Sequence, residues 1–165
     1  MAKAKTATFF IRRKLDIAAT TAATLTIDTS AYVDPADRQG LMIEEVDYIF
    51  FDSSNKLPYE TTTRQYAVQL LAGGFSELQD YDNEDLISSG GMVMSSTYQP
   101  SKDADVYPDA LATPGGRILV DDQMTLVGKS SDTSANMTVA VLIKAKVVSL
   151  SNKDYMALAL QTVAN

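Results

Sequence analysis

The residues best suited to chemistry are a run of carboxylates near the middle of the chain. Its members are Asp80, Asp82, Glu84 and Asp85. Carboxylate oxygens at alternate positions are ligands that Ca²⁺ prefers. An EF-hand loop needs Gly at its sixth position and Glu at its twelfth, and counting from Asp80 those positions hold Asp85 and Gly91. We therefore interpret the run as a solvated loop or a helix cap, and we predict no metal site.

Two pairs of adjacent acids, Glu44-Glu45 and Asp121-Asp122, raise the question of glycoside hydrolysis. That reaction needs two carboxyl groups about 5–9 Å apart across a sugar cleft, usually beside aromatic platforms. The chain has no Trp, and both pairs fall where a strand is expected to kink. The pairs are therefore poor candidates for a glycosidase.

Nucleophilic catalysis finds little support, because the chain has no His and no Cys. These are the commonest general base and the commonest thiol nucleophile, and without Cys there are no disulfides or thiolate metal sites. The segment 88–91 (Ser-Ser-Gly-Gly) lacks the Gly that precedes the Ser of a nucleophile elbow. Gly73-Gly74 and Gly115-Gly116 lack the spacing of phosphate-binding loops and indicate turns. A Ser–Lys dyad stays open, but no nucleophile, base and orienting group can be lined up. We expect no enzyme and no cofactor.

Positive charge is concentrated at the start of the chain. The basic residues there are Lys3, Lys5, Arg12, Arg13 and Lys14, and no acidic residue precedes Asp16. The whole chain has 14 basic and 21 acidic residues, so a basic arm precedes an acidic body. Such an arm can bind nucleic acid or lace onto the acidic face of a neighbouring copy. The alternative is a solvated terminal strand whose charged edge prevents aggregation.

Alternating apolar and polar residues predict that most of the chain is β-strand. The predicted strands cover residues 8–17, 23–28, 41–50, 66–70, 92–98, 117–127 and 137–150. In the first strand Arg13 falls on the apolar parity, which predicts a bulge or an exposed strand end. In the third, the apolar parity changes at Glu44-Glu45, and a β-bulge there would restore one buried face.

The segments between strands carry turn and helix signals. Residues 34–37 (Asp-Pro-Ala-Asp) predict a turn, and one helical turn is expected at 83–87. Residues 99–116 form a long connection, a kink is expected at 121–122, and 128–136 form a polar hairpin loop. At the end of the chain, Ser151 to Asp154 match a capping box, so residues 155–160 predict a short helix, with a last strand as the alternative.

Five of the eight tyrosines lie in or beside predicted loops. They are Tyr32, Tyr59, Tyr81, Tyr98 and Tyr107. Loop tyrosines suit protein interfaces because they combine a large apolar area with a polar end. A carbohydrate-binding face would use them equally well, and the alternative is that they close the core at the bases of the loops.

Together these elements predict one all-β domain over residues 1–165. Its parts are a basic arm (1–7), a two-sheet antiparallel sandwich (8–150) and a C-terminal helix (151–165). The order of strands, the long loops, the basic arm and the pair formed by 117–127 and 137–150 resemble the single jelly-roll capsid proteins of tailless icosahedral viruses. The fold expected from this resemblance is jelly-roll-like.

The resemblance implies a virion protein that assembles with copies of itself and with other virion proteins, with the basic residues facing nucleic acid or neighbouring subunits. It would be made in the host cytoplasm, since the N-terminus shows no signal peptide and no apolar run is long enough to span a membrane. Two other classes stay open. One is a phage decoration, tail or adaptor protein that forms a trimer or small ring, and the other is a carbohydrate-binding sandwich.

Overall fold

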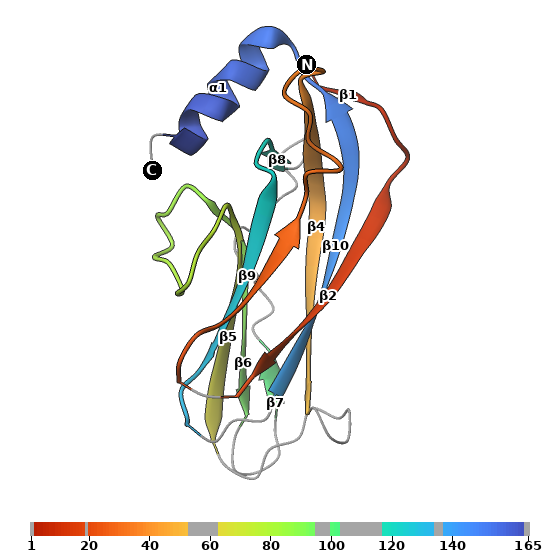
Figure 1. Cartoon of the computed structure of the whole chain (residues 1–165). Coiled ribbons are helices and arrows are strands. Elements are labelled where there is room, and N and C mark those ends of the chain that lie inside the picture. Colours follow the sequence, from red (N-terminus) through yellow and green to blue (C-terminus); the bar gives the residue numbers. More distant parts are fainter. Residues whose placement is uncertain are drawn as a thin grey trace.

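The computed structural model describes residues 2–18, 20–52, 63–94, 100–102, 117–133 and 137–163, which form two stacked sheets and one helix (Figure 1). Sheet A is formed by β1 (Lys3–Ala4), β2 (Phe9–Ile17), β4 (Gln39–Asp52), β8 (Arg117–Leu119) and β10 (Met137–Ser149). Sheet B is formed by β3 (Ala23–Asp28), β5 (Arg64–Ala72), β6 (Leu86–Met94), β7 (Pro100–Lys102) and β9 (Gln123–Ser130). Helix α1 (Asn152–Val163) follows β10.

The strand pairs are nested along the chain. β5 pairs with β6, β4 with β8, β3 with β9 and β2 with β10, all antiparallel. The first and last of these pairs lie in different sheets, and so do β3–β9 and β4–β8. One long antiparallel ribbon is therefore wrapped around the core, which is the winding of a jelly roll. The predicted all-β, jelly-roll-like sandwich with a C-terminal helix is confirmed.

The space between the sheets is filled with apolar side chains, most of them from the predicted inward parities of β2, β4, β5 and β10. Two glycines of sheet B let large side chains of sheet A come close. A Cβ on Gly90 would stand 2.7 Å from the Tyr48 ring, and one on Gly128 would stand 2.8 Å from Ile17. Tyr48 is fully buried and donates its hydroxyl to the Ser88 carbonyl at 3.2 Å, and burial raises the pKa of that hydroxyl. The two sheets are thus held at close range at these positions.

Several local predictions are confirmed. The β4–β10 register shifts opposite Lys144 and Ala145, so Glu44 is the extra residue of a bulge and both Ile43 and Val46 face the core. The Asp34 carboxylate accepts the Ala36 amide at 2.9 Å, which closes the predicted turn. Gly73 has φ +83°, the left-handed conformation of a glycine turn.

Arg13 needs no bulge. β2 pairs with β10 without a shift from Phe9 to Ile17, and Arg13 is exposed although it shares the parity of buried Ile11 and Leu15. Its guanidinium donates to the Arg12 carbonyl at 2.8 Å. The exposed strand end predicted as the alternative is not found either, because Arg13 lies in the middle of β2 and Leu15 and Ile17 beyond it are buried.

Four predictions were wrong in the second half of the chain. Residues 83–85 form turns and β6 already begins at Leu86, so there is no helical turn at 83–87 and the strand starts before residue 92. The predicted strand 117–127 is two strands, because the bend at 121–122 carries the chain from β8 in sheet A to β9 in sheet B. β9 continues to Ser130, which shortens the predicted loop 128–136. Residues 134–136 and most of 99–116 lie outside the described residues.

Helix α1 begins as the capping box predicted, and the alternative of a last strand is wrong. The Asp154 amide donates to the Ser151 hydroxyl at 3.2 Å. Tyr155 then packs with Leu150 against Met42 and Val148 on the outer side of sheet A. The helix thus covers one end of that face, at the same end of the molecule as the N-terminus (Figure 1). In the part of the chain that the structure describes, no helix is long and apolar enough to cross a membrane.

The described residues of the predicted basic arm, 2–7, are folded along β10. Lys3 and Ala4 form β1 opposite Ser149 and Val148, and the Lys5 amide donates to the Val147 carbonyl at 2.8 Å. The Lys5 ammonium donates to Gln39 at 3.0 Å. The sandwich therefore extends into the segment that was expected to be an arm.

Candidate functional site

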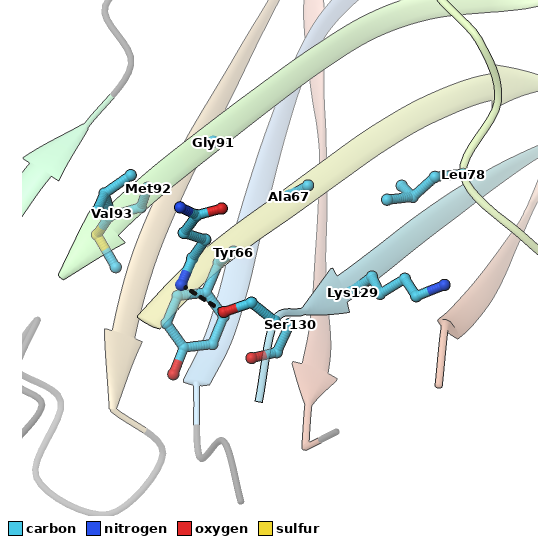
Figure 2. Close-up of a pocket in the computed structure, with 10 residues that line it drawn as sticks. Tyr66, Ala67, Leu78, Gly91, Met92, Val93, Lys129 and Ser130 are labelled. Carbon is cyan, nitrogen blue, oxygen red and sulfur yellow. Dashed lines mark hydrogen bonds between the residues drawn. The ribbon is translucent and has the colours of Figure 1, made fainter. Parts of the chain in front are cut away.

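The outer face of sheet B carries a hollow of about 480 Å³ between β5, β6 and β9. One row across the sheet reads Lys129, Ala67 and Gly91, and the two small residues leave the floor of the hollow open. Figure 2 shows Lys129 and Leu78 on one side of Ala67, and Met92 and Val93 on the other.

The groups around this hollow are already engaged with each other. The Lys129 ammonium lies 3.3 Å from the Glu77 carboxylate, and the Ser131 hydroxyl accepts the Gln65 amide at 3.0 Å (Figure 2, dashed line). Ser130 has the opposite parity and is buried. Among the described residues, no contact joins Lys129 to a serine hydroxyl, so the hollow does not assemble a Ser–Lys dyad.

Much of the remaining outer face of sheet B is covered by residues 73–85. The Gln69 side chain donates to the Gln79 carbonyl at 2.9 Å and accepts the Gln79 amide at 2.7 Å. Phe75 and Leu78 pack on a small cluster of buried residues, Leu71, Leu86 and Val127. The chain therefore uses its own loop to remove these apolar side chains from water.

The acidic run forms the tip of this loop. The Asn83 side chain accepts the Asp85 amide at 2.8 Å, and the Asn83 amide donates to the Asp80 carbonyl at 3.1 Å. These bonds satisfy backbone groups of a turn, as in a solvated loop. No group of three or more Asp or Glu in the described residues is arranged to hold a metal ion.

The outer face of sheet A is different, because two large apolar side chains on it are exposed to solvent. Phe10 of β2 is 53% exposed and Ile49 of β4 is 58% exposed. Between them Ala140 and Leu142 of β10 are half-buried. A shallow depression of about 410 Å³ lies here. We call this region the sheet A patch; it comprises Phe10, Arg12, Lys14, Asp47, Ile49, Ala140 and Leu142.

Charge is separated across the sheet A patch. Cations stand on the β2 side, where Arg12 pairs in register with Leu142 and Lys14 with Ala140. Carboxylates stand on the β4 side, where Asp47 pairs in register with Leu142. Lys14 lies 5.9 Å from the centre of the Phe51 ring, a cation–π contact. Within the described part of the chain, neither the Arg12 guanidinium nor the Asp47 carboxylate has an ion-pair or hydrogen-bond partner.

The other charges of this face are paired inside the chain. Lys146 lies 2.6 Å from Glu44, and Lys144 lies 3.4 Å from Glu45. The hydrogen bond from Lys146 holds the pKa of the Glu44 carboxyl below its ordinary value. Glu44 and Glu45 each form an ion pair with a lysine of β10 on the outer face of sheet A. Among the described residues, the two carboxylates do not face each other across a cleft.

The second acidic pair lies where the chain crosses between the sheets. Burial, followed by the negative charges of Asp85 and Asp122, raises the pKa of the Asp121 carboxyl. The backbone carbonyls of both residues accept from Thr29, with the Thr29 hydroxyl donating to Asp121 at 2.8 Å. Asp121 and Asp122 therefore help to fix the segment in which the chain passes from sheet A to sheet B.

The predicted interface tyrosines are scattered. Tyr32 stacks on Phe9 with ring centroids 5.0 Å apart and packs against the core, as the core-closing alternative expects. Tyr81 is 63% exposed at the acidic loop. Tyr59, Tyr98 and Tyr107 lie outside the described residues. The described tyrosines form no common surface.

The predicted basic residues separate into two groups. Lys3 and Lys5 lie beside the C-terminal half of β10, whereas Arg12, Arg13 and Lys14 lie beside its N-terminal half. The partners of the second group on the sheet A patch were missed from the sequence. Phe10 and Ile49 carry a usable signal, since each is a large apolar residue on the polar parity of its strand.

Comparison with solved structures gives a likeness of architecture. No protein-family model matches the sequence, and no curated protein matches it. Among solved structures, the chain is similar to a chain of Desmodium yellow mottle tymovirus, with 10% identity, 87% of each chain covered and a TM-score of 0.41. This is a likeness of overall architecture only.

Proposed function

We propose that this chain is a structural virion protein, a capsid subunit that self-assembles into a shell through repeated contacts between copies of itself. The observation that carries the proposal is the sheet A patch. Exposed apolar patches mark interaction sites, and here the exposed side chains of Phe10 and Ile49 lie on either side of the half-buried Ala140 and Leu142. The loop 73–85 packs on Leu71, Leu86 and Val127 of sheet B, whereas Phe10 and Ile49 on the outer face of sheet A are more than half exposed.

The winding of the chain supports a virion role over other uses of the fold. Double-sheet jelly rolls serve as capsid, lectin and cupin domains. Among the described residues, the inside of this sandwich is filled by side chains such as Tyr48 and Ile17, which disfavours an internal ligand site of the cupin kind. What the molecule offers to partners is its outer surface, which suits contacts with other proteins.

Native mass and images of one purified sample test the proposal. Light scattering should give particles far above the 17.9 kDa of one chain, and negative-stain images should show closed shells of uniform diameter. A discrete trimer or small ring would replace the shell with an accessory role such as decoration. A monomer at every concentration, with or without nucleic acid, would contradict self-assembly.

A further inference from the structure

One row of the sheet A patch holds two opposite charges on either side of an apolar residue. Leu142 of β10 is in register with Arg12 of β2 and with Asp47 of β4. Residues directly opposite in antiparallel strands point to the same face, so all three side chains stand on the outer face. Adjacent strands lie nearly 5 Å apart, which places Arg12 and Asp47 about 10 Å from each other. Among the described residues these two charges do not pair with each other, and Leu142 stands between them.

The row is complementary to itself under one kind of symmetry. When two such sheets face each other across a two-fold axis parallel to β10, the β2 side of one copy stands over the β4 side of the other. Arg12 then meets Asp47 of the second copy, Asp47 meets its Arg12, and the two Leu142 side chains meet on the axis. An axis that runs across the strands would instead oppose Arg12 to Arg12 and Asp47 to Asp47.

The dimensions of sheet packing agree with this contact. Face-to-face sheets pack about 10 Å apart with their strands within about 30° of parallel. A long Arg side chain and a short Asp side chain together bridge a gap of that size. With the axis parallel to β10, the β10 strands of the two copies run parallel, and the row of Arg12, Leu142 and Asp47 brings opposite charges together on both sides of the axis.

We propose that the sheet A patch docks onto the same patch of a second copy of this chain, about a two-fold axis parallel to β10 through Leu142. This inference rests on the proposed function and names one of its contacts. The exposed apolar side chains of Phe10 and Ile49 flank the contact, and docking would bury them and remove their apolar surface from water. A nucleic acid is a poorer occupant, because Asp47 and Glu45 stand on the same face as Arg12 and Lys14 and repel phosphate.

Charge reversal on either side of the row gives a decisive test. Arg12→Glu places a carboxylate against Asp47 of the other copy at both ends of the row, and Asp47→Arg places two cations together at both ends. Each variant alone should therefore associate at least about tenfold more weakly than the wild type. In an equimolar mixture of the two variants, opposite charges face each other again wherever unlike copies meet. Sedimentation velocity of each variant alone and of the mixture should therefore show association restored only on mixing.

Two controls have the same changes of net charge on the opposite sheet. Lys129→Glu and Glu77→Arg break an exposed ion pair beside the hollow of sheet B, and each should associate at this contact as the wild type does. Arg12 and Asp47 are both exposed, and circular dichroism should show wild-type folding in every variant. A mixture that stays as dissociated as its components, or single variants that associate like the wild type, overturns the two-fold contact and leaves self-assembly standing. A wild type that is itself monomeric throughout overturns the proposed function as well.

Discussion

The outer faces of the two sheets are treated differently by the same chain. On sheet B, residues 73–85 fold over Leu71 and are tied down by the two hydrogen bonds between Gln69 and Gln79. On sheet A, helix α1 covers one end of the face, and the other end leaves Phe10 and Ile49 in water. An apolar residue on an outer face is therefore not by itself a sign of a binding surface. The sign is that, among the described residues, no segment of the chain covers Phe10 and Ile49.

The largest difference in stability is expected between two truncations, one of an apolar residue on each face. Leu71→Ala should lower the free energy of unfolding by about 2–4 kcal/mol, because Leu71 is fully buried under the loop and its loss leaves a cavity. Ile49→Ala should change it by about 0.5 kcal/mol or less, because that side chain is mostly exposed. Urea unfolding monitored by circular dichroism measures both. Equal losses would show that the two faces are covered to the same extent.

Two neighbouring glycines of β6 face opposite sides of sheet B. Gly90 faces the core and Gly91 lines the hollow. Gly90→Ala should destabilise by about 1–3 kcal/mol, because its Cβ would stand 2.7 Å from the ring of buried Tyr48. Gly91→Ala should be neutral or slightly stabilising, because its Cβ would meet nothing nearer than the Tyr66 carbonyl at 3.4 Å. Thermal unfolding of the pair distinguishes the two sides. A Gly91→Ala variant as unstable as Gly90→Ala would mean that the hollow is not free space.

The charges that are paired within sheet A should contribute to stability, unlike Arg12 and Asp47. Glu44→Gln should cost about 0.5–1 kcal/mol at neutral pH, because it removes the 2.6 Å ion pair with half-buried Lys146. Lys146 lowers the pKa of Glu44, so this contribution is present above the ordinary value of 4.5 and is lost as the pH falls through the lowered pKa. The looser and more exposed pair of Glu45 and Lys144 makes Glu45→Gln the matched control, with a smaller cost. A cost for Glu44→Gln that stays constant down to pH 2 would contradict this pairing.

The smallest effect is expected where the chain crosses from sheet A to sheet B. The pKa of Asp121 is raised, so its folded state favours the neutral carboxyl, and the ionised group opposes folding as the pH rises. Asp121→Asn should therefore raise the unfolding temperature at neutral pH, and the gain should vanish below the ordinary pKa of 3.8. Asp82→Asn, at an exposed position of the acidic loop, should show no such gain. A lower unfolding temperature for Asp121→Asn at neutral pH would reverse the sign and exclude this account.

Much of the fold could be predicted because four long strands bury one face along most of their length and expose much of the other. The parity of residues in β2, β4, β5 and β10 follows directly from that exposure, and the change of parity at Glu44 predicted its bulge. The helix cap at Ser151 is local chemistry and needs no tertiary information.

The errors lie where tertiary contacts override local patterns. β6 contains two glycines, a residue of low strand propensity, and Gly90 fits here because a Cβ at its position would stand 2.7 Å from the Tyr48 ring of the other sheet. The bend at residues 121–122 looks like a kink in one strand, since periodicity does not reveal that the chain changes sheets there.

The candidate surface could be predicted only in part. Arg12 and Lys14 were recognised as basic residues of one strand, but their partners Leu142 and Asp47 come from distant strands. Only the registers of β10 with β2 and with β4 bring the three strands together. A single sequence contains no signal for that pairing.

The most direct test of self-assembly through the uncovered face compares the wild type with Ile49→Asp. Ile49 is exposed in one chain, so the substitution should leave the fold intact and place a charge in the contact. Sedimentation velocity over a concentration series should show wild-type species above 17.9 kDa that increase with concentration, and a strong reduction of those species for Ile49→Asp. Wild-type and variant profiles that coincide, whether as monomers or as assemblies, would contradict the account.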